Sequence, residues 1–259
     1  MDIYCMCNQK GGVGKTADTI GLAAALAEKG RRVLVIDFDP QGHLTDALGL
    51  AEAVEPATLK NALLGEWTGD AHQLVTHYRE RFDVIPWNLD AFLLLPGLYM
   101  SQGREHRLSR LLEAFEDDYD VCLIDCAPSL AADTDTALLA ARRRPGRRGG
   151  VLVPVEAEDS SIRALRMLLR QIGTLGDYMG ADIDIVGLVP SKVDVRRGSI
   201  TTSTLAAFQA LGEPPVLGVI RDRTEIRKAW REKKTVLEYA PQCEASGWYR
   251  ELAQAVIDA

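Results

Sequence analysis

Residues 8–16 carry the feature that most restricts the fold, the run Asn-Gln-Lys-Gly-Gly-Val-Gly-Lys-Thr between an apolar segment and a helical pattern. Its second half, Gly14-Lys15-Thr16, is the ending of a phosphate-binding loop (P-loop). In such a loop, backbone N–H groups and a lysine hold phosphate oxygens, and a hydroxyl reaches Mg²⁺. Residues 2–8 read as a buried strand and residues 17–29 as a helix, which is the context that the motif needs. We therefore expect a nucleotide-binding α/β fold.

The same loop carries two lysines, Lys10 and Lys15, where an ordinary P-loop carries one. Lys15 occupies the usual clamp position, so Lys10 is well placed to serve another nucleotide across a dimer interface. Gln9 stands where the usual pattern has its first glycine, so the strict motif is not matched. The alternative is a glycine-rich turn with two solvated lysines, and the strand and helix on either side argue against it.

The remaining sequence alternates strand patterns with helix patterns. Several strand segments are continuous apolar runs, which is typical of parallel strands covered on both faces. We expect strands at 2–8, 32–37, 82–86, 119–125, 151–155, 183–189 and 216–220. We expect further helices near 104–117, 130–142, 159–173, 199–211, 224–233 and 246–257, whereas 51–100 is less regular. The pattern predicts a single α/β domain over 1–259, with helices on both faces of a mostly parallel twisted sheet.

Composition narrows the classes of protein that fit. The 259 residues are 47% apolar and 26% charged, as in an ordinary globular domain. No apolar run approaches the roughly 18 residues that span a bilayer, so we expect no membrane association. No basic-then-apolar leader precedes the first strand, so we expect no secretory signal. The five cysteines are an odd number without a disulfide-framework pattern, which indicates a reducing cytosol.

Positive charge is unevenly distributed, although the net charge is −7. Residues 191–234 contain ten Lys or Arg and five Asp or Glu, a local balance of +5 that can bind phosphates. Residues 142–150 read Arg-Arg-Arg-Pro-Gly-Arg-Arg-Gly-Gly, which Pro and Gly mark as a loop. Its five arginines make it a candidate phosphate contact, and a solvated surface loop is an equally good interpretation.

Three carboxylates follow apolar strands, at the edge of the sheet where α/β folds bind ligands. Asp37 and Asp39 lie in Asp-Phe-Asp-Pro-Gln-Gly after the second expected strand, and Asp125 ends the strand at 119–125. An apolar strand ending in Asp is typical of a Walker B element, whose acid holds Mg²⁺. We expect Thr16, Asp37 and Asp125 to order the metal and Asp39 to position the attacking water. Such acids otherwise often cap loops and helix starts.

Three segments together resemble the nucleotide motifs of the ParA family, the deviant-Walker-A ATPases that segregate plasmids and chromosomes. They are the loop at 8–16, Val-Leu-Val-Ile-Asp-Phe-Asp-Pro-Gln-Gly at 33–42 and Leu-Ile-Asp-Cys-Ala-Pro-Ser-Leu at 123–130. Further similar segments are Val-Leu-Val-Pro-Val-Glu at 151–156, Leu-Glu-Tyr at 237–239 and Tyr-Arg-Glu-Leu at 249–252. The similarity covers essentially the whole chain. Because the P-loop begins at once, we expect a short member without an N-terminal helix-turn-helix domain.

The resemblance implies a weak ATPase that uses ATP and Mg²⁺ and pairs as an ATP-sandwiched homodimer. Lys10 resembles the signature lysine that contacts the nucleotide of the partner subunit, and Lys15 and Asp39 match the other catalytic positions. Nucleotide contacts are expected from Lys10, Gly11, Gly12, Val13, Gly14, Lys15, Thr16 and Ala17. The resemblance also implies a cytoplasmic, nucleoid-associated protein that binds DNA without sequence preference. A ParB-type centromere-binding partner is expected to stimulate hydrolysis and release the DNA.

The base side of the nucleotide site is expected after the strand at 183–189. Ser191-Lys192-Val193-Asp194 is similar to the Asn-Lys-x-Asp guanine reader of GTPases, but the family also places an Asp-containing loop here and uses ATP. On that resemblance we expect ATP, with Ser191, Lys192, Asp194, Arg221 and Asp222 around the base. The family's Ile-Pro-Arg appears here as Ile220-Arg221-Asp222, so one expected DNA-contacting arginine is missing from its place.

DNA contacts are expected from a set of basic residues late in the chain. Phosphate contacts tolerate relocation better than contacts to base edges, so neighbouring cations can supply the charge. The set is Arg196, Arg197, Arg223, Arg227, Lys228, Arg231, Lys233 and Lys234. Positions 224, 227, 228 and 231 share one face of a helix. A solvated helix laced with ion pairs is the alternative.

Three rival functions share the double-lysine loop. The iron protein of nitrogenase needs cysteines on loops that face a dimer axis, whereas Cys5 and Cys7 alternate within the first strand, and buried apolar thiols are the better interpretation. MinD-like membrane positioning needs a basic amphipathic tail, whereas residues 251–259 are acidic. A positioning ATPase for a cargo other than DNA would have the same nucleotide motifs, so that alternative stays open.

Overall fold

The structure, a computed structural model, describes residues 1–194 and 199–259. The expected DNA contacts Arg196 and Arg197 lie outside the described residues. The described strands are β1 (Asp2–Met6), β2 (Val33–Phe38), β3 (Thr76–Arg79), β4 (Phe82–Ile85), β5 (Val121–Cys126), β6 (Gly149–Val155) and β7 (Ile185–Pro190).

Helices connect these strands. The α-helices are α1 (Lys15–Glu28), α2 (His43–Ala47), α3 (Leu59–Leu64), α4 (Leu94–Tyr99), α5 (Arg107–Leu112), α6 (Ala132–Ala140), α7 (Asp159–Met179), α8 (Ser199–Ala210), α9 (Thr224–Arg231), α10 (Val236–Tyr239) and α11 (Glu244–Asp258). The 3₁₀ helices are η1 (Ala71–Leu74), η2 (Leu89–Leu93), η3 (Arg104–His106) and η4 (Glu113–Phe115).

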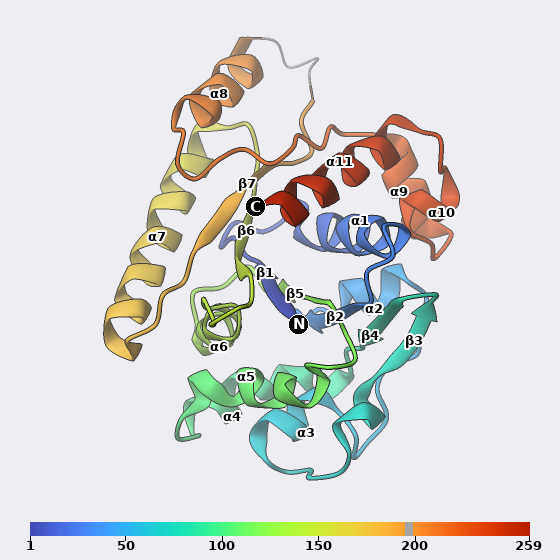
Figure 1. The fold of residues 1–259 in the computed structure, drawn as a ribbon, viewed down its shortest axis with the longest axis vertical. Coiled ribbons are helices and arrows are strands. Elements are labelled where there is room, and N and C mark those ends of the chain that lie inside the picture. The colour runs from blue at the N-terminus through green and yellow to red at the C-terminus, as the bar shows by residue number, and fades with distance from the viewer. Residues whose placement is uncertain (195–198) are drawn as a thin grey trace.

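The seven strands form one sheet in the order β3-β4-β2-β5-β1-β6-β7. Neighbouring strands pair in parallel, except that β3 pairs antiparallel with β4 at one edge. In Figure 1, α1 and α11 lie on one side of the sheet, and α4, α5 and α6 lie on the other. The expected fold class is therefore confirmed: an α/β domain around a mostly parallel sheet.

Side chains of each strand enter two apolar cores alternately, because successive residues of a strand face opposite sides of the sheet. On β1, Ile3 and Cys5 pack into the core beneath α3 to α8, whereas Tyr4 and Met6 pack into the core beneath α1, α2 and α9 to α11. Burial on both faces explains why the strand segments read as continuous apolar runs. The carboxyl edge of the sheet is thus supported from both sides.

Three details of the sequence-based interpretation are corrected. Residues 216–220 do not form a strand; they run beside β7 with separate hydrogen bonds, such as Leu217 N–H to the Leu188 carbonyl oxygen at 3.0 Å. Pro215 lacks an N–H donor and Gly218 lacks a side chain to pack, so a continuous ladder is not built there. β3 was not expected, because it is a four-residue edge strand. The helix expected at 104–117 is divided into η3, α5 and η4, since 3₁₀ turns are frequent at helix ends.

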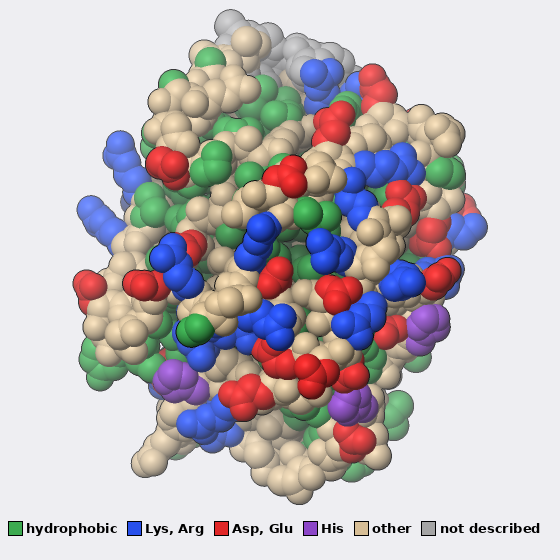
Figure 2. Space-filling model, viewed as in Figure 1, with side chains coloured by type: hydrophobic (Ala, Val, Ile, Leu, Met, Phe, Trp, Pro, Cys, Tyr) green, Lys and Arg blue, Asp and Glu red, His purple; other side chains and the backbone are tan. Residues whose placement is uncertain are grey.

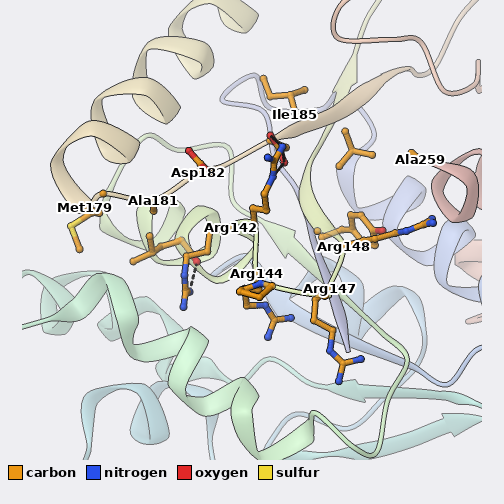
Figure 3. A pocket seen from close by; sticks show the side chains of 18 of the residues that line it. Arg142, Arg144, Arg147, Arg148, Met179, Ala181, Asp182, Ile185 and Ala259 are labelled. Carbon is orange, nitrogen blue, oxygen red and sulfur yellow. Dashed lines mark hydrogen bonds and ion pairs between the residues drawn. The ribbon is translucent and has the colours of Figure 1, made fainter.

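The arginine-rich segment 142–150 lies between α6 and β6, at the amino edge of the sheet and opposite the P-loop. A tight turn organises it: Arg147 N–H donates to the Arg144 carbonyl oxygen at 3.1 Å, and Gly146 has φ 69°. Glycine is favoured there because that turn position needs a positive φ. Figure 3 shows Arg142, Arg144, Arg147 and Arg148 pointing in different directions around a cavity of about 1040 Å³.

The arginines of this segment bind other parts of the same chain. Arg143 makes two hydrogen bonds to Asp184, at 2.8 and 2.9 Å. Arg144 binds Glu116 and donates to the Met1 carbonyl oxygen at 2.6 Å, and Arg148 donates to the Ile257 carbonyl oxygen. Figure 2 shows one face of the molecule on which basic and acidic side chains are interspersed. These arginines therefore connect the amino ends of the strands to neighbouring segments.

Candidate nucleotide-binding and hydrolysis site

The strand order brings the expected nucleotide segments to one edge of the sheet. β2, β5 and β1 are neighbours, and their register pairs Asp37 with Asp125 and Asp125 with Met6. The P-loop follows β1 directly, so it lies at the same carboxyl edge as both carboxylates. In open α/β sheets this edge is where ligands bind.

Two glycines give the P-loop its shape. Gly12 and Gly14 have φ values of 77° and 106°, which L side chains rarely adopt, and Gly14 is the N-cap residue of α1. The first N–H groups of α1 have no partner within the helix, so they are available to an anion. Gly11, Val13 and Ala17 complete the loop and the start of the helix. The loop thus presents backbone donors at a positively polarised helix end.

Lys15 lies within this cradle and is 6% exposed. Its ammonium group donates to the carbonyl oxygens of Asn8, at 3.1 Å, and Lys10, at 3.3 Å. Burial lowers the pKa of Lys15, and the nearby Asp125 carboxylate acts in the opposite direction. A phosphate bound at the helix end would give this buried ammonium an anionic acceptor, which is a stronger partner than a carbonyl oxygen.

Asp37 and Asp125 are buried, and within residues 1–194 and 199–259 each has one oxygen without a hydrogen-bond partner. Thr45 donates its N–H and hydroxyl to Asp37 Oδ2, at 2.8 and 2.6 Å, while Asp37 Oδ1 has no partner. The Thr19 hydroxyl lies 3.3 Å from Asp125 Oδ1, while Asp125 Oδ2 has no partner. Two unpartnered carboxylate oxygens on neighbouring strands fit a hard divalent cation such as Mg²⁺. The Thr16 hydroxyl, which acts to lower the pKa of Asp125, fits as a third oxygen ligand.

The electrostatics of these two carboxyls also fit a cation. Burial raises the pKa of Asp37 to about 6, although hydrogen bonds from Thr45 oppose the shift. Burial raises the pKa of Asp125 well above its usual value, and repulsion from Asp37 adds to the rise. A neighbouring cation favours the ionised form of both groups, so cation binding and proton release are expected to be coupled.

Asp39 lies beyond β2 and is 8% exposed. Its Oδ1 accepts a hydrogen bond from Gln41 N–H at 2.9 Å. The Trp87 indole N–H donates to the Pro40 carbonyl oxygen at 2.8 Å, so the loop after β2 is held to the loop after β4. The carboxylate is therefore fixed at the carboxyl edge, directly after the strand that carries Asp37. Its position is compatible with orienting a water molecule at that edge.

Lys10 is engaged by carboxylates that lie outside the P-loop. Its ammonium group binds the carboxylates of Glu156 and Glu158, the latter at 2.9 Å. Both glutamates follow β6, and Gln9 of the same loop donates to the Ala164 carbonyl oxygen of α7 at 2.9 Å. The start of the P-loop is thus fastened to the β6–α7 segment.

The base side of the site is a cavity of about 330 Å³ beyond Gly14 and Ala17. Lys192, Asp194, Arg221 and Asp222 line it, as the sequence-based interpretation expected, and further walls come from Glu156, Arg223, Ile226 and Trp230. Lys192 adopts a positive φ of 53° and donates to the Gly12 carbonyl oxygen at 2.5 Å. Ser191 is 1% exposed, and its hydroxyl binds Asp18 instead of facing the cavity.

Asp18 and Tyr249 are two residues of this region that sequence reasoning missed. Asp18 lies in the first turn of α1, where the acid reads as favourable to the helix dipole, and Tyr249 reads as a core residue of α11. In the structure the Tyr249 hydroxyl donates to Asp18 at 3.1 Å, and both residues line the cavity. The sequence offered one indication of this contact: Asp18 is a charged residue on the side of α1 that is otherwise apolar and buried.

The expected DNA contacts on and near α9 fall into two groups. Arg223, Arg227 and Lys233 form ion pairs with Glu244, Asp222 and Asp46, at 2.6, 2.7 and 2.6 Å respectively. Lys228, Arg231 and Lys234 are exposed and form no ion pair with any residue in 1–194 or 199–259. Ala229 of α9 is buried. Of the six expected DNA contacts on and near α9, three are therefore already engaged in ion pairs within the chain.

Four of the five cysteines lie in the sheet or directly after a strand, whereas Cys243 is the N-cap residue of α11. Cys5 and Cys122 lie on the buried strands β1 and β5, and Cys7 and Cys126 are also buried. Within the described ranges, no group of three or more His, Cys, Asp or Glu side chains is arranged to hold a metal ion. Burial raises the pKa of Cys122, which keeps its thiol protonated. No helix in the described part of the chain is long and apolar enough to cross a membrane.

Comparison with known proteins connects this geometry to a family. A model of an AAA domain family matches residues 1–185. The chain is 34% identical over 258 residues to the chromosome partitioning protein ParA of Caulobacter vibrioides, which covers 98% of this chain and 93% of the relative. It is 30% identical over 255 residues to the sporulation initiation inhibitor protein Soj of Bacillus subtilis, which covers 98% of this chain and 97% of the relative.

Solved structures agree. A cobyrinic acid a,c-diamide synthase from Mycobacterium smegmatis, with a bound ATP analogue and magnesium, is 29% identical with a TM-score of 0.79 over 99% of this chain and 94% of its own. The ATP complex of a Cyanothece McdA variant has a TM-score of 0.85 over 99% of this chain and 96% of its own, and its 19% identity supports the fold alone. The site takes ATP and Mg²⁺, and the chain belongs to the ParA/Soj family of P-loop ATPases.

Proposed function

We propose that the chain is a DNA-partitioning ATPase in which ATP pairs two protomers, pairing permits non-specific DNA binding, and hydrolysis ends it. A ParB-type centromere-binding protein stimulates hydrolysis, and the ATPase works on the nucleoid in the cytoplasm. The relatives support a partitioning or positioning ATPase in general. The single observation that carries the finer proposal is the placement of Lys10, whose ammonium group binds the carboxylates of Glu156 and Glu158 outside the P-loop.

Lys10 is held by contacts that a triphosphate can replace. The side chains of Lys10, Glu156 and Glu158 are 28%, 24% and 42% exposed, so water screens these ion pairs. Ion pairs of this kind contribute roughly 0–1 kcal/mol each. A triphosphate held by a second protomer carries more charge than either glutamate. Transfer of Lys10 from the glutamates to that triphosphate would supply positive charge where the transferring phosphoryl group develops negative charge.

The hydrolytic chemistry is assigned to residues at the carboxyl edge of the sheet. Lys15 and the N–H groups of the P-loop bind the β- and γ-phosphates, and Asp39 orients the attacking water. Thr16, Asp37 and Asp125 would hold Mg²⁺, which neutralises phosphate charge when bound. A buried acceptor without a partner normally costs about 1–3 kcal/mol, so the open oxygens of Asp37 and Asp125 support a ligand role.

DNA binding is assigned first to the exposed cations of α9 and the segment after it. Lys228, Arg231 and Lys234 keep their charge available, whereas Arg223, Arg227 and Lys233 must first leave carboxylates of their own chain. Non-specific DNA binding releases counterions from the phosphates, and its affinity then falls steeply with salt. Pairing of two protomers doubles the number of these cations, which explains why DNA binding should require ATP.

A gel-shift assay with a duplex of arbitrary sequence tests the whole proposal when it compares ATP, ADP and no nucleotide. We expect a shift with ATP alone, and we expect it to disappear when the salt concentration is raised. Lys228→Ala/Arg231→Ala/Lys234→Ala should lose the shift but retain ATP-dependent pairing by light scattering. Lys10→Ala should lose both, because it removes the group that joins the protomers.

Other outcomes of this assay point elsewhere. ATP-dependent pairing without any DNA shift would favour a positioning ATPase for a different cargo, which the same nucleotide site would serve. Normal pairing of Lys10→Ala would refute the role of Lys10 across the interface. A DNA affinity that does not change between 50 and 200 mM salt would refute phosphate contacts by the cations of α9, because each such contact should contribute to the salt dependence.

A further inference from the structure

A buried carboxylate joins three elements directly behind the P-loop. Asp18 is 1% exposed, and both of its oxygens are engaged by side chains far away in the sequence. The Tyr249 hydroxyl of α11 donates to Asp18 Oδ1 at 3.1 Å, and the Ser191 hydroxyl, which follows β7, binds Asp18 Oδ2. We call Asp18, Ser191 and Tyr249 the Asp18 clamp. It joins α11 and the segment at 191–194 to α1, the helix that starts within the P-loop.

Two glycines leave room for the side chains of the Asp18 clamp. Tyr249 is fully buried, and its ring lies against Gly21 so closely that a Cβ there would come within 2.6 Å of ring carbons. Any larger residue at position 21 would displace the tyrosine, and with it the hydroxyl that reaches Asp18. On the other side, a Cβ on Gly14 would lie 3.3 Å from Ser191 Cβ and 3.4 Å from Asp18 Oδ2. The last glycine of the P-loop therefore packs directly on the clamp.

The clamp also determines where the base-side wall lies. Lys192, which follows Ser191, donates to the Gly12 carbonyl oxygen, and Val193 N–H donates to the Ile220 carbonyl oxygen at 3.1 Å. Asp222 N–H in turn donates to the Val193 carbonyl oxygen at 3.0 Å. These backbone hydrogen bonds join the segment at 191–194 to the segment at 220–222. Residues of both segments line the cavity beyond Ala17. Asp18 is the point at which this wall is attached to α1.

We propose that Asp18 is a positioning residue for ATP: through Ser191 and Tyr249 it fixes the distance between the phosphate cradle and the wall that receives the nucleoside. The inference rests on ATP binding alone and on neither dimerisation nor DNA binding. The phosphate cradle has its own fixed backbone, with φ values set by Gly12 and Gly14. Loss of the clamp should therefore weaken contacts to the nucleoside and leave contacts to phosphate in place.

The test compares two ligands on the same variants. ATP needs both the cradle and the wall, whereas inorganic tripolyphosphate needs the cradle alone. For Asp18→Ala we expect the Kd for ATP to rise by about tenfold or more, as for the loss of two buried hydrogen bonds. The Kd for tripolyphosphate should stay within about twofold, because the contacts of the cradle to phosphate remain in place. A tenfold change would require the loss of one of those contacts. In steady-state hydrolysis, KM for ATP should rise with little change in kcat.

Three further variants keep the test decisive if Asp18→Ala does not fold. Ser191→Ala and Tyr249→Phe each remove one hydroxyl with little change in volume, and each should weaken ATP binding by a few fold without affecting tripolyphosphate. Asp18→Asn keeps the shape and one acceptor, and it should recover part of the affinity that Asp18→Ala loses. Asp135→Asn is the matched control, because Asp135 joins α6 to α7 through Gln171 at 2.7 Å, away from the cavity.

Two results would overturn the inference. The first is equal weakening of ATP and tripolyphosphate binding in Ser191→Ala and Tyr249→Phe, which would mean that the clamp maintains the cradle or the general fold. The second is unchanged ATP affinity in all the folded clamp variants. A selective loss of ATP affinity that is shared by Asp135→Asn would count in the same direction, because it would show that the effect is not specific to the Asp18 clamp.

Discussion

The two edges of the sheet use the same kinds of charged residue in opposite ways. At the amino edge, Arg143 and Arg144 of the arginine-rich segment are paired with Asp184 and Glu116. At the carboxyl edge, Lys15 donates to carbonyl oxygens, and among the described residues Asp37 and Asp125 each keep an oxygen without a partner. The amino edge is thus largely satisfied within the chain, whereas the carboxyl edge is arranged for groups that the chain does not provide.

Whether a charged side chain has a partner within the chain distinguishes structural from functional charges better than the number of charges in a segment does. Five arginines within 142–148 made that segment a candidate phosphate contact in the sequence, with a solvated surface loop as an equally good interpretation. Arg143, Arg144 and Arg148 already hydrogen-bond acceptors in other segments of the chain, so the structure gives them a role in joining those segments. Unpartnered buried groups are costly, and a chain retains them where a ligand completes the site.

The largest expected effect is at the buried lysine of the carboxyl edge. Lys15→Ala removes the cation that we assign to the β- and γ-phosphates. We expect ATP binding to weaken by at least about 100-fold, since charge-assisted hydrogen bonds to phosphate are the strong ones. Isothermal titration with ATP and Mg²⁺ measures this. An ATP affinity within tenfold of the wild-type value would contradict the comparison of the two edges, because it would show that Lys15 contributes no more to ATP binding than a surface arginine does.

Asp39→Ala is expected to have the largest effect on kcat, whereas Lys15→Ala has the largest effect on ATP binding. Loss of the carboxylate that orients water should lower kcat by about 100-fold to 10,000-fold. ATP binding should be preserved, because Asp39 is not assigned to the phosphates or to the metal. Single-turnover hydrolysis and equilibrium binding, measured on the same preparation, separate the two effects. An unchanged kcat would exclude Asp39 from the hydrolytic step.

Acid should weaken Mg²⁺ binding at the paired carboxylates. The pKa of Asp37 is about 6, so protons compete with the cation below that pH, and the apparent Mg²⁺ affinity in the presence of ATP should fall as pH falls through 6. For one competing proton the fall is about tenfold per pH unit. Asp37→Asn should flatten this dependence. A wild-type affinity that is constant between pH 5 and 7 would contradict the assignment of Asp37 to the metal.

The smallest effects are expected at the amino edge. Arg144→Ala leaves Glu116 without its guanidinium partner and should lower the free energy of unfolding by about 1 kcal/mol, which shifts Tm by about 2–4 °C in a domain of this size. Arg147→Ala loses only a 3.7 Å approach to Glu116 and should change stability by less than about 0.5 kcal/mol. ATPase activity should be unchanged in both. Thermal melts and turnover assays would expose any ligand role for this segment.

Much of the fold and of the site could be predicted from particular residues. Continuous apolar runs predicted β1, β2 and β5, and the residues that follow them predicted which side chains meet at one edge. β3 could not be predicted, because a short edge strand carries little pattern of its own and forms by pairing with β4. The failure at 216–220 has the opposite cause: the segment is apolar enough, but Pro215 and Gly218 interrupt its ladder.

The site residues divide in a similar way. Lys15, Thr16 and Asp125 are identified by local motifs, since the spacing of a loop and the end of a strand are written in consecutive residues. The Asp18 clamp could not be found in this way, because Asp18 and Tyr249 are 231 positions apart and meet only when α11 packs on α1. The same holds for the ion pairs that neutralise Arg223 and Lys233, whose partners lie on other segments.

The amino-acid sequence by itself determined the P-loop, the alternation of strands and helices, and the carboxylates at the strand ends. Each of these depends on contacts between residues that are close along the chain or on a periodic burial pattern. The tertiary structure decided which charges are satisfied: that Arg144 binds Glu116, that Lys10 binds Glu156 and Glu158, and that Asp125 keeps an open oxygen. Whether a charged group has a partner depends on residues brought together from distant segments, and local sequence does not encode that.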